Sequence, residues 1–463
     1  MTSMQENNQT ARPKVHIETW GCQMNIADSE KMLALMKESR FESTSDPQSA
    51  DLIILNTCHI REKARHKVLS RLGVLREMKD KRKDLVIAVA GCVAQAEGKK
   101  LLEQAPTIDL LLGPGRISRL PDLYKEHLES GAQVMALGFP KPEEALDADT
   151  KDYVLPALDG KNNISRYVNI QHGCNNFCTF CVVPFTRGSE RSERVGTILA
   201  RSQSLIEQGA REITLLGQNV NSYGHDLIAR GEYQEGVSEP FVDLLGQVAK
   251  LEGLKSLRFT TSNPHDLTKA LADLFATTKV LGRYFHLPVQ SGSDAILEKM
   301  RRKVTVAEYL EKIAWLRASV PDMAISTDLI VGFPGETDED FEATLDLVSK
   351  VRYSFIFAFK YSPRKSTAAI RFKDQVPEEV KDARLARLNS LQEKISMEQN
   401  DAELGQIRSV LFQYESSREP GSYYGRTEHF RQVKVSSPES LIGEVRQVKI
   451  TVASKTTLEG ILI

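Results

Sequence analysis

Three cysteines lie close together in the run Q-H-G-C-N-N-F-C-T-F-C, at positions Cys174, Cys178 and Cys181. Three thiolates on one loop can hold a metal centre and still leave it one ligand short, and an open coordination position is where a metal site does chemistry. An iron–sulfur cubane with three cysteine ligands fits this count, because one of its irons stays free. The nearest alternative is a structural zinc site, for which His172 would have to be the fourth ligand. A disulfide is disfavoured, because nothing marks the chain for an oxidising compartment.

The other three of the six cysteines, Cys22, Cys58 and Cys92, share a different setting. Each ends an apolar run rich in β-formers, and a polar, helix-like stretch follows, such as residues 28–38 and 60–78. This alternation predicts parallel strands joined by right-handed crossovers. Parallel strands end at the same edge of a sheet, so we expect the three thiolates to converge there and to hold a second metal cluster. The alternative is three separate buried structural cysteines.

Size and charge set the broad class. A chain of 463 residues with 41% hydrophobic residues can bury ordinary cores, which predicts about two to four domains. The net charge of −1 gives no global basic field for nucleic acid, and the locally basic residues 61–83 are equally typical of a solvated helix face. No apolar stretch is long enough to span a membrane and the polar N-terminus lacks a signal pattern, so we expect a cytoplasmic protein without membrane association.

The mixed α/β chain divides into four predicted parts. Residues 14–130 form an N-terminal open parallel α/β sheet domain with a further strand at 108–112, and residues 131–160 form a polar linker. Residues 161–400 alternate strands and helices in six β–α units, too few for a closed eight-stranded barrel, which predicts a partial TIM-like barrel. The strands are expected at 166–171, 212–216, 256–261, 284–289, 324–331 and 355–361. Helices are expected at 197–208, 241–251, 306–319, 338–351 and 377–404.

Polar residues follow four consecutive strands of this predicted barrel, at the end where barrel active sites lie. They are Gly217, Gln218, Asn219 and Asn221, then Ser262 and Asn263, then Gln290, Ser291, Gly292 and Ser293, and finally residues 331–336. One such group alone is typical of an ordinary loop. Four in register indicate one polar pocket across the barrel mouth, beside the loop that carries the first cysteine trio.

Residues 401–463 change to short β-runs separated by turns, which predicts a small all-β barrel. Within it, residues 425–431 (G-R-T-E-H-F-R) place arginines beside an aromatic ring. This combination suits single-stranded RNA, and a surface turn is the alternative.

Taken together, these segments resemble a known family. The cysteine run, with Phe180 before its last cysteine, resembles the signature of radical S-adenosylmethionine (SAM) enzymes, and the whole chain resembles the methylthiotransferases of that superfamily. The matching segments are T-W-G-C-Q-M-N, N-T-C, A-G-C, G-C-N-N-F-C-T-F-C-V-V-P-F-T-R-G, L-G-Q-N-V-N-S-Y-G, H-L-P-V-Q-S-G-S and D-L-I-V-G-F-P-G-E-T. They run across the first two domains, with no departure at the six cysteines. Residues 401–463 resemble the TRAM module, an RNA-binding β-barrel.

The resemblance implies two 4Fe–4S clusters, one on each cysteine trio, and two molecules of SAM for each turnover. The cluster at Cys174, Cys178 and Cys181 would bind SAM and cleave it to a radical that takes hydrogen from carbon 2 of an adenine. The cluster on the other trio would carry the sulfur. No catalytic residue beyond the cluster ligands is implied.

The resemblance also implies roles for residues near the first cluster. Phe180 would touch the SAM adenine, and Gln218 and Asn219 would hold the methionyl amino group. Further cofactor-binding candidates are Ser262, Gln290, Ser291 and Asp328. Arg187, in T-R-G after the cysteine loop, would face substrate or cofactor, with an ordinary surface arginine as the alternative.

Residues 425–433, G-R-T-E-x-x-R-x-V, resemble the tRNA-2-methylthio-N6-dimethylallyladenosine synthase branch of the family. That implies insertion of a methylthio group at carbon 2 of N6-(dimethylallyl)adenosine, next to the tRNA anticodon. Alternatives are the same chemistry on threonylcarbamoyl-adenosine tRNA or on a ribosomal-protein aspartate, or an iron–sulfur scaffold or RNA-binding module without catalysis. The implied partners are the tRNA anticodon stem-loop, an electron donor such as flavodoxin or ferredoxin, and a sulfur carrier, and we expect a monomer.

Overall fold

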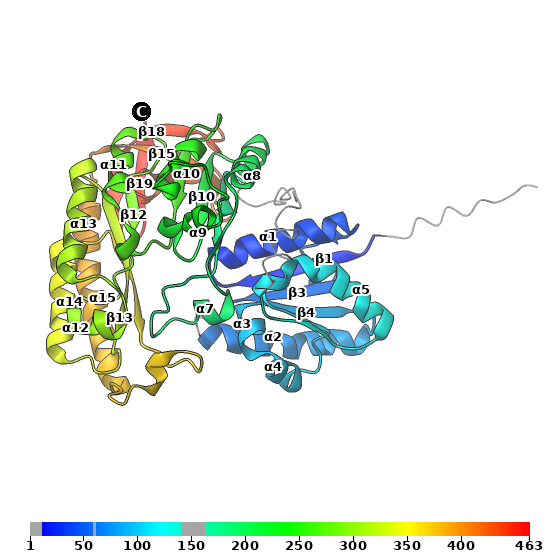
Figure 1. Cartoon of the computed structure of the whole chain (residues 1–463). Coiled ribbons are helices and arrows are strands. Elements are labelled where there is room, and N and C mark those ends of the chain that lie inside the picture. Colours follow the sequence, from blue (N-terminus) through cyan, green and yellow to red (C-terminus); the bar gives the residue numbers. More distant parts are fainter. Residues whose placement is uncertain (1–11, 59–61, 140–162) are drawn as a thin grey trace, which may run out of the picture. The chain divides into compact units, whose positions relative to one another are not determined.

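The computed structural model describes residues 12–58, 62–139 and 163–463 (Figure 1). Contacts divide the chain into two units: residues 1–156 together with 185–188, and residues 157–184 together with 189–463. The greater part of the predicted linker, from residue 140 on, lies outside the described residues.

The first unit is built on a six-stranded, fully parallel sheet in the order β2-β1-β3-β4-β5-β6. Its strands are β1 Lys14–Trp20, β2 Glu42–Ser43, β3 Leu52–Thr57, β4 Val86–Gly91, β5 Leu110–Leu112 and β6 Val134–Ala136. Every residue of β3 and β4 is buried, as expected for strands covered on both faces. The predicted open parallel α/β sheet is confirmed.

Helices cover both faces of this sheet. They are α1 Gln23–Glu38, α2 Glu62–Lys81, α3 Cys92–Glu97, α4 Lys99–Gln104 and α5 Leu120–Ser130, with short 3-10 helices at Pro47–Ser49 and Pro114–Arg119. One hydrophobic core joins α1 and α5 to the sheet, and a second joins α2, α3 and α4 to its other face. Figure 1 shows α1 on one side of the sheet and α2 on the other.

Two short strands escaped the sequence prediction. β2 has two residues and β6 has three, which is too short for any periodicity to show. Because β6 pairs with β5, the sheet continues to Ala136, into the segment expected as a linker.

The second unit begins with six strands in two parallel sheets, β11-β10-β7 and β12-β13-β14. The strands are β7 Ser165–Asn169, β10 Glu212–Leu216, β11 Ser256–Phe259, β12 Tyr284–His286, β13 Ala324–Val331 and β14 Phe355–Lys360, with a small ribbon of β8 Gln171–His172 and β9 Arg191–Ser192. A single parallel bridge between Leu257 and Leu281 joins the two sheets. All six predicted strands are present, so the partial barrel is confirmed.

Helices separate these strands as predicted. They are α7 Val183–Thr186, α8 Val195–Glu207, α9 His225–Ala229, α10 Pro240–Val248, α11 Lys269–Thr277, α12 Asp294–Lys299, α13 Val306–Ser319 and α14 Asp338–Val351. Threonine side chains cap α13 and α14 in full capping boxes, Thr305 with Glu308 and Thr337 with Asp340. No helix among the described residues is both long and apolar enough to cross a bilayer.

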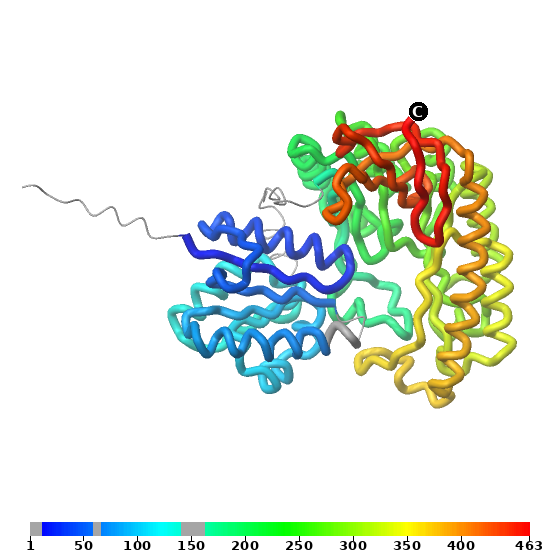
Figure 2. The backbone as a smooth tube through the Cα atoms, turned by 180° about the vertical axis from the view of Figure 1, so that it is seen from behind, coloured from blue at the N-terminus to red at the C-terminus, as the bar shows by residue number. Residues whose placement is uncertain are grey.

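A long helix, α15 Glu378–Asp401, leads from this barrel into the C-terminal one, and Figure 2 shows it as an orange rod. The predicted all-β barrel is confirmed as a closed five-stranded barrel in the order β15-β16-β17-β19-β18. Its strands are β15 Ile407–Glu415, β16 Ser422–Thr427, β17 Gln432–Ser436, β18 Val445–Ala453 and β19 Leu458–Leu462. Closure leaves no free strand edge.

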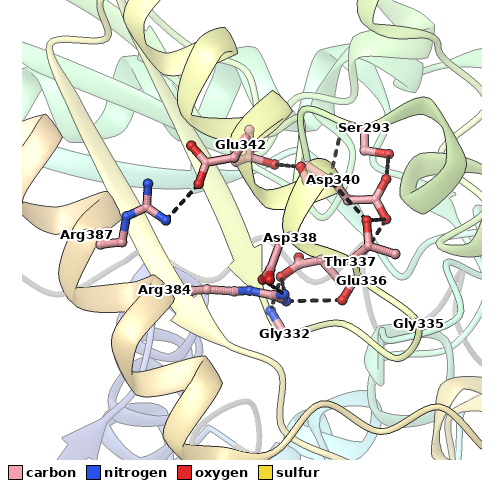
Figure 3. Close-up of polar contacts among 12 residues, drawn as sticks. Ser293, Gly332, Gly335, Glu336, Thr337, Asp338, Asp340, Glu342, Arg384 and Arg387 are labelled. Atoms are coloured by element: carbon pink, nitrogen blue, oxygen red, sulfur yellow. Dashed lines mark hydrogen bonds and ion pairs between the residues drawn. The ribbon is translucent and has the colours of Figure 1, made fainter.

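The loop after β13 is fixed by an ion pair with α15 (Figure 3). Glu336 accepts hydrogen bonds from the Gly332 amide at 2.8 Å and from Arg384 at 2.6 Å, and Arg384 also reaches Asp338 at 2.7 Å. The Glu336 carboxylate is thus committed to the scaffold. This part of V-G-F-P-G-E anchors the fold and does not contribute its acid to a polar pocket.

Candidate metal centres

Three neighbouring strands of the first sheet end in register. Trp20 of β1 lies beside Thr57 of β3, which lies beside Gly91 of β4. A cysteine follows each strand within two residues, namely Cys22, Cys58 and Cys92. β2 lies outside β1, so the direction of winding reverses between β1 and β3, and ligands of open α/β sheets bind at such a switch point. The structure therefore brings these residues, the sheet-edge trio, to one place.

A glycine precedes two of these cysteines for steric reasons. At Gly91 the backbone has φ of +91°, and a β-carbon would lie 2.5 Å from the Asn56 Oδ1 atom. At Gly21 a β-carbon would lie 2.3 Å from Asn25 Oδ1 and 2.9 Å from Cys58 Cβ. Neither position has room for a side chain. Glycine is therefore needed before Cys22 and before Cys92 for the backbone to place these cysteines at the sheet edge.

Two buried asparagines, which sequence reasoning missed, hold this edge together. The Asn25 amide donates to Asn56 Oδ1 at 3.1 Å, and the Asn56 amide donates to the Asn25 carbonyl at 2.8 Å and to Ser29 Oγ at 2.9 Å. Asn25 Oδ1 also accepts from the Cys22 amide at 3.3 Å. The signal was an asparagine at the end of an otherwise apolar strand, where asparagine is disfavoured unless it is bonded.

The thiols of the trio interact electrostatically. A hydrogen bond with Cys58 outweighs burial and lowers the pKa of Cys22 to about 6, with help from the positive charge of Arg187. Burial raises the pKa of Cys92. At neutral pH the lowered pKa of Cys22 favours its thiolate, whereas burial favours the protonated thiol at Cys92. Thiolates are the ligands that iron takes.

Arg187 also reaches this edge, because residues 185–188 belong to the first unit. Its Nη2 donates to the Asp28 carboxylate at 2.7 Å, and both side chains are buried. The alternative of an ordinary surface arginine is therefore wrong.

The second trio, here the loop trio, comprises Cys174, Cys178 and Cys181 between β8 and α7. Thr179 anchors the loop, since its amide and hydroxyl donate to the carbonyls of Met300 and Lys299 at 3.1 and 2.8 Å. The turn is closed by a bond from the Cys181 amide to the Cys178 carbonyl at 3.0 Å. The position after the first strand of the barrel is the one that the sequence predicted.

Each sulfur of the loop trio accepts one hydrogen bond. The donors are Asn176 Nδ2 to Cys174 at 3.5 Å, Arg302 Nη1 to Cys178 at 3.6 Å and the Val183 amide to Cys181 at 3.5 Å. Burial, with the other cysteines nearby, raises the pKa of Cys181 to about 12, and burial also raises that of Cys174. Binding of a metal would displace these protons, and the donors would then stabilise thiolates. Arg302 was not found from the sequence.

In the part of the chain that the structure describes, no three His, Cys, Asp or Glu side chains are placed to hold one metal ion. A cubane binds each thiolate at a different iron, so its cysteine sulfurs stand farther apart than those around one zinc ion. His172, the candidate fourth zinc ligand, directs Nε2 at Glu193 Oε1, 3.3 Å away. His172 therefore already has an acidic partner.

Polar atoms without partners gather after β10 and β11. Among the described residues, both amide atoms of Gln218, Oδ1 of Asn219 and Oγ of Ser262 are buried and accept or donate no hydrogen bond. Nδ2 of Asn219 is used, since it donates to Asp266 at 2.7 Å. Buried polar groups are normally paired, so these three side chains fit a ligand with amino, carboxylate or hydroxyl groups.

The other predicted pocket residues lie on the second sheet. The Gln290 amide donates to the Asp328 carbonyl at 3.0 Å, and Ser291 Oγ accepts from the Ser293 amide at 3.2 Å. The Asp328 carboxylate lies 3.6 Å from His286 Nε2. Phe180 is half-buried against the hydrophobic cluster that includes Phe333. Gln290 and Ser291 follow β12, whereas Asp328 lies within β13 and Phe180 in the cysteine loop. None of these side chains has an orphaned buried atom among the described residues.

Glu190 is a further site residue that the sequence did not reveal. It accepts a hydrogen bond from Ser222 Oγ at 2.8 Å, and its amide donates to Asn175 Oδ1 in the cysteine loop at 3.1 Å. Burial raises the pKa of its carboxyl to about 7. A carboxyl with this pKa is able to gain or lose a proton near neutral pH.

The arginines of residues 425–431 are engaged inside the second unit. Phe430 stacks on Tyr284 with ring centroids 4.8 Å apart, and the Arg426 guanidinium lies 4.0 Å over the Phe430 ring. Arg431 donates to Gln399 at 2.9 Å and also to Asn400. The segment is neither a plain surface turn nor a set of free cations for RNA, because it docks the C-terminal barrel.

Three family models match this chain. They are "Uncharacterized protein family UPF0004" over residues 14–113, "Radical SAM superfamily" over residues 168–348 and "TRAM domain" over residues 401–463. The matches cover the first sheet except β6, most of the partial barrel and the C-terminal barrel.

Curated relatives match over almost their full length. A tRNA-2-methylthio-N(6)-dimethylallyladenosine synthase from Maricaulis maris is 44% identical, covering 98% of this chain and 98% of its own. One of the same name from Geotalea uraniireducens is 42% identical, covering 97% and 99%.

Solved structures show the same kind of fold. The radical S-adenosylmethionine methyltransferase TsrM from Kitasatospora setae, solved with cobalamin and a 4Fe–4S cluster bound, has a TM-score of 0.57 at 12% identity, covering 86% of this chain and 77% of its own. At that identity the likeness concerns the fold alone.

Proposed function

Because the chain belongs to the family of tRNA-2-methylthio-N6-dimethylallyladenosine synthases and is a radical SAM enzyme, we propose that it replaces the hydrogen on carbon 2 of N6-(dimethylallyl)adenosine, next to the tRNA anticodon, with a methylthio group. The observation that carries the proposal is the presence of two separate cysteine trios, at a sheet edge and on the loop after β8. One trio suffices to make a radical, but a methylthio group also needs a bound sulfur to transfer.

The loop trio would hold a 4Fe–4S cluster with one iron open, which its three hydrogen-bonded sulfurs fit. When bound, this cluster supplies the electron that cleaves SAM to a carbon-centred radical, the chemistry that an unactivated C–H bond requires. The orphaned polar atoms of Gln218, Asn219 and Ser262 support their role in binding the amino and carboxylate groups of SAM. Phe180 would contact the adenine, and Gln290, Ser291 and Asp328 would line the same pocket.

The sheet-edge trio would hold the second cluster, from which sulfur is delivered. The Asn25–Asn56 pair fixes the edge, and the lowered pKa of Cys22 favours the thiolate that iron needs. A second SAM would supply the methyl group. Both clusters are three-cysteine sites, so each keeps a position for an external ligand.

The proposal implies partners and a compartment. The substrate is the tRNA anticodon stem-loop, and the TRAM match over residues 401–463 supports RNA binding by the C-terminal barrel. An electron donor, such as flavodoxin or ferredoxin, and a sulfur carrier are needed to restore the clusters. We place the enzyme, as a monomer, in the cytoplasm, where tRNA and a reducing environment occur together.

Iron and sulfide analysis tests the two-cluster arrangement. After anaerobic reconstitution we expect about eight irons per chain in the wild type and about four in Cys22→Ala and in Cys174→Ala. Cys174→Ala should also lose the production of 5′-deoxyadenosine from SAM, whereas Cys22→Ala should keep it. A wild-type chain with about four irons would contradict the second cluster.

Nucleoside analysis of tRNA tests the substrate. A strain lacking this gene should accumulate N6-(dimethylallyl)adenosine without its 2-methylthio form, and the wild-type chain should restore that form while Cys22→Ala and Cys174→Ala should not. Intact methylthiolation in the deletion strain would reject the assignment. Loss of the threonylcarbamoyl derivative instead would identify the alternative substrate.

A further inference from the structure

Residues 185–188 follow the loop trio in sequence but pack in the first unit. Thr186 and Arg187 are buried there. At Gly188, where φ is +85°, a β-carbon would lie 2.9 Å from the ring of Phe139, so this position has no room for a side chain. The fit of this short segment fixes where the Arg187 side chain enters the unit.

The guanidinium of Arg187 and the carboxylate of Asp28 form a buried ion pair. Their side chains are 5% and 4% exposed, and the N–O distance is 2.7 Å. Asp28 lies on α1, the helix that Cys22 caps. Buried pairs stabilise a fold weakly because both charges lose water, so a pair at this position calls for another explanation.

The explanation lies in what else Arg187 faces. Burial raises the pKa of the Cys92 thiol, and the positive charge of Arg187 acts against this rise. The same charge helps to lower the pKa of Cys22. Burial lowers the pKa of Arg187. The negative charges of Asp28, Cys92 and Cys22 outweigh burial, so the pKa of Arg187 is raised overall. The negative charge of Asp28 raises the pKa of Cys92, which is opposite to the effect of Arg187. The sheet-edge trio thus lies in the field of one buried cation and one buried anion.

We propose that Arg187, held in place by Asp28, is a positioning residue that sets the reduction potential of the cluster on the sheet-edge trio. This rests on the proposed function, since it requires a cluster there. Net charge is one of the factors that set the potentials of iron–sulfur clusters, and Arg187 supplies a buried positive charge that acts on Cys22 and Cys92. A buried cation favours the reduced, more negative cluster, and a buried anion disfavours it.

Because Arg187 and Asp28 carry opposite charges, removing each one should shift the midpoint potential in opposite directions. Arg187→Met removes the cation and should lower the midpoint potential of the sheet-edge cluster. Asp28→Asn removes the anion, keeps the shape of the side chain and should raise it. A pair that served only as a structural brace would be broken by either change, and both variants would then move the potential the same way or leave it unchanged.

The measurement uses the full chain with Cys174, Cys178 and Cys181 all changed to alanine, so that one cluster remains. Iron is counted first, and the midpoint potential is then found by a redox titration followed by electron paramagnetic resonance. We expect each charge variant to change the one-electron reduction equilibrium at least tenfold, about 59 mV, in opposite directions. Arg187→Lys should stay closer to the parent than Arg187→Met.

Arg82→Met is the matched control. Arg82 pairs with Asp51 at 3.0 Å, and Asp51 precedes β3 whereas Cys58 follows it, so this variant loses an arginine–carboxylate pair at the far end of the strand. Its potential should equal that of the parent.

The outcomes separate the two hypotheses. No iron in the parent with three alanines counts against the second cluster and hence the proposed function. Iron with unchanged potentials, or with shifts of the same sign in Arg187→Met and Asp28→Asn, overturns the role of Arg187. If Arg187→Met fails to fold, a raised potential in Asp28→Asn supports the proposal and an unchanged one overturns it.

Discussion

Arg302 donates a hydrogen bond from Nη1 to the sulfur of Cys178, 3.6 Å away, across 124 positions of sequence. Its other terminal nitrogen donates to the Pro288 carbonyl at 2.5 Å, and the side chain is buried. The loop trio thus has a buried arginine at one of its sulfurs, and this cation would face the negative charge of a thiolate-bound cluster.

Replacement of Arg302 by methionine should therefore weaken the cluster of the loop trio. Hydrogen bonds to charged groups contribute about 1.5–3 kcal/mol, which corresponds to about tenfold or more in retention of iron. The measurement is iron per chain and 5′-deoxyadenosine formed from SAM in Arg302→Met. Arg301→Met is the control, because Arg301 is the exposed neighbour. Equal iron in both variants would contradict the role of Arg302.

The two arginines of α15 in Figure 3 make a matched test of buried and exposed ion pairs. Arg384 and Glu336 are 7% and 2% exposed and 2.6 Å apart, whereas Arg387 and Glu342 are both 55% exposed and 2.7 Å apart. Arg384→Met leaves a buried carboxylate without its cation and should reduce the free energy of unfolding by about 3–5 kcal/mol. Arg387→Met should cost about 1 kcal/mol or less. Urea unfolding followed by circular dichroism measures both, and similar losses would refute the distinction.

Gly91 controls the delivery of Cys92 to the sheet edge. An alanine there would put its β-carbon 2.5 Å from Asn56 Oδ1 and 2.6 Å from the Thr57 carbonyl, so the strand end must move. Gly91→Ala should lose the iron of the sheet-edge trio, about four per chain, and keep 5′-deoxyadenosine formation.

The control for Gly91 is a glycine with free space. No heavy atom within 4 Å would meet a β-carbon at Gly73, which lies on α2. Gly73→Ala should keep all iron and stabilise the helix by about 0.5–1 kcal/mol. Full iron in Gly91→Ala would show that the strand end tolerates the shift.

Glu190 should make stability depend on pH in a definite direction. Burial raises the pKa of its carboxyl from 4.5 to about 7, so the folded chain binds the proton more tightly than the unfolded chain does. The contribution is fully present below about pH 4.5 and is lost as the pH rises through about 7. Burial lowers the pKa of His286 to about 4, which acts in the opposite sense between about pH 4 and 6.5.

Because His286 also contributes a pH dependence, the effect of Glu190 is tested by comparing the wild type with Glu190→Gln. The free energy of unfolding of the wild type minus that of Glu190→Gln, measured on cluster-free protein, should fall by a few kcal/mol between about pH 4.5 and 7. The contribution of His286 cancels in this subtraction. A difference that is flat or rises with pH would contradict the raised pKa.

Local patterns in the sequence predicted most of the scaffold. β10, β13, α13 and α14 have the predicted bounds, because each is a full-length element with clear periodicity and flanking turns. The sequence also marked all six cysteines, since a motif and a repeated strand end are local signals. It missed β2 and β6, which have too few residues to show a period.

Contacts between distant residues were out of reach. The Arg187–Asp28 bond spans 159 positions and the Arg302–Cys178 bond spans 124, and nothing near either arginine distinguishes it from a solvated one. Residues 425–431 show the same limit. The local sequence does not distinguish an arginine–aromatic pair that binds RNA from one that packs at a domain interface. Arg426 and Phe430 are of the second kind.

Phe430 should hold the C-terminal barrel to the partial barrel. Its ring stacks on Tyr284 of β12, and Arg258 of β11 lies 4.9 Å from its centroid while donating to the Thr427 carbonyl at 3.0 Å. Phe430→Ala removes these ring contacts, together with that to Phe355 of β14, and should cost about 2 kcal/mol, since the ring is half-buried. Because the lost contacts join the two barrels, hydrogen exchange should quicken in β12, β16 and β17 together.

Tyr414→Ala is the control for this interface. Tyr414 stacks on Tyr424 at 5.4 Å, within the C-terminal barrel itself, and is 39% exposed. Its loss removes an aromatic pair of similar size without touching the other barrel, so exchange in β12 should stay at the wild-type rate. Faster exchange in β12 of Tyr414→Ala, or an unchanged rate in Phe430→Ala, would mean that the two barrels are held by contacts other than this ring.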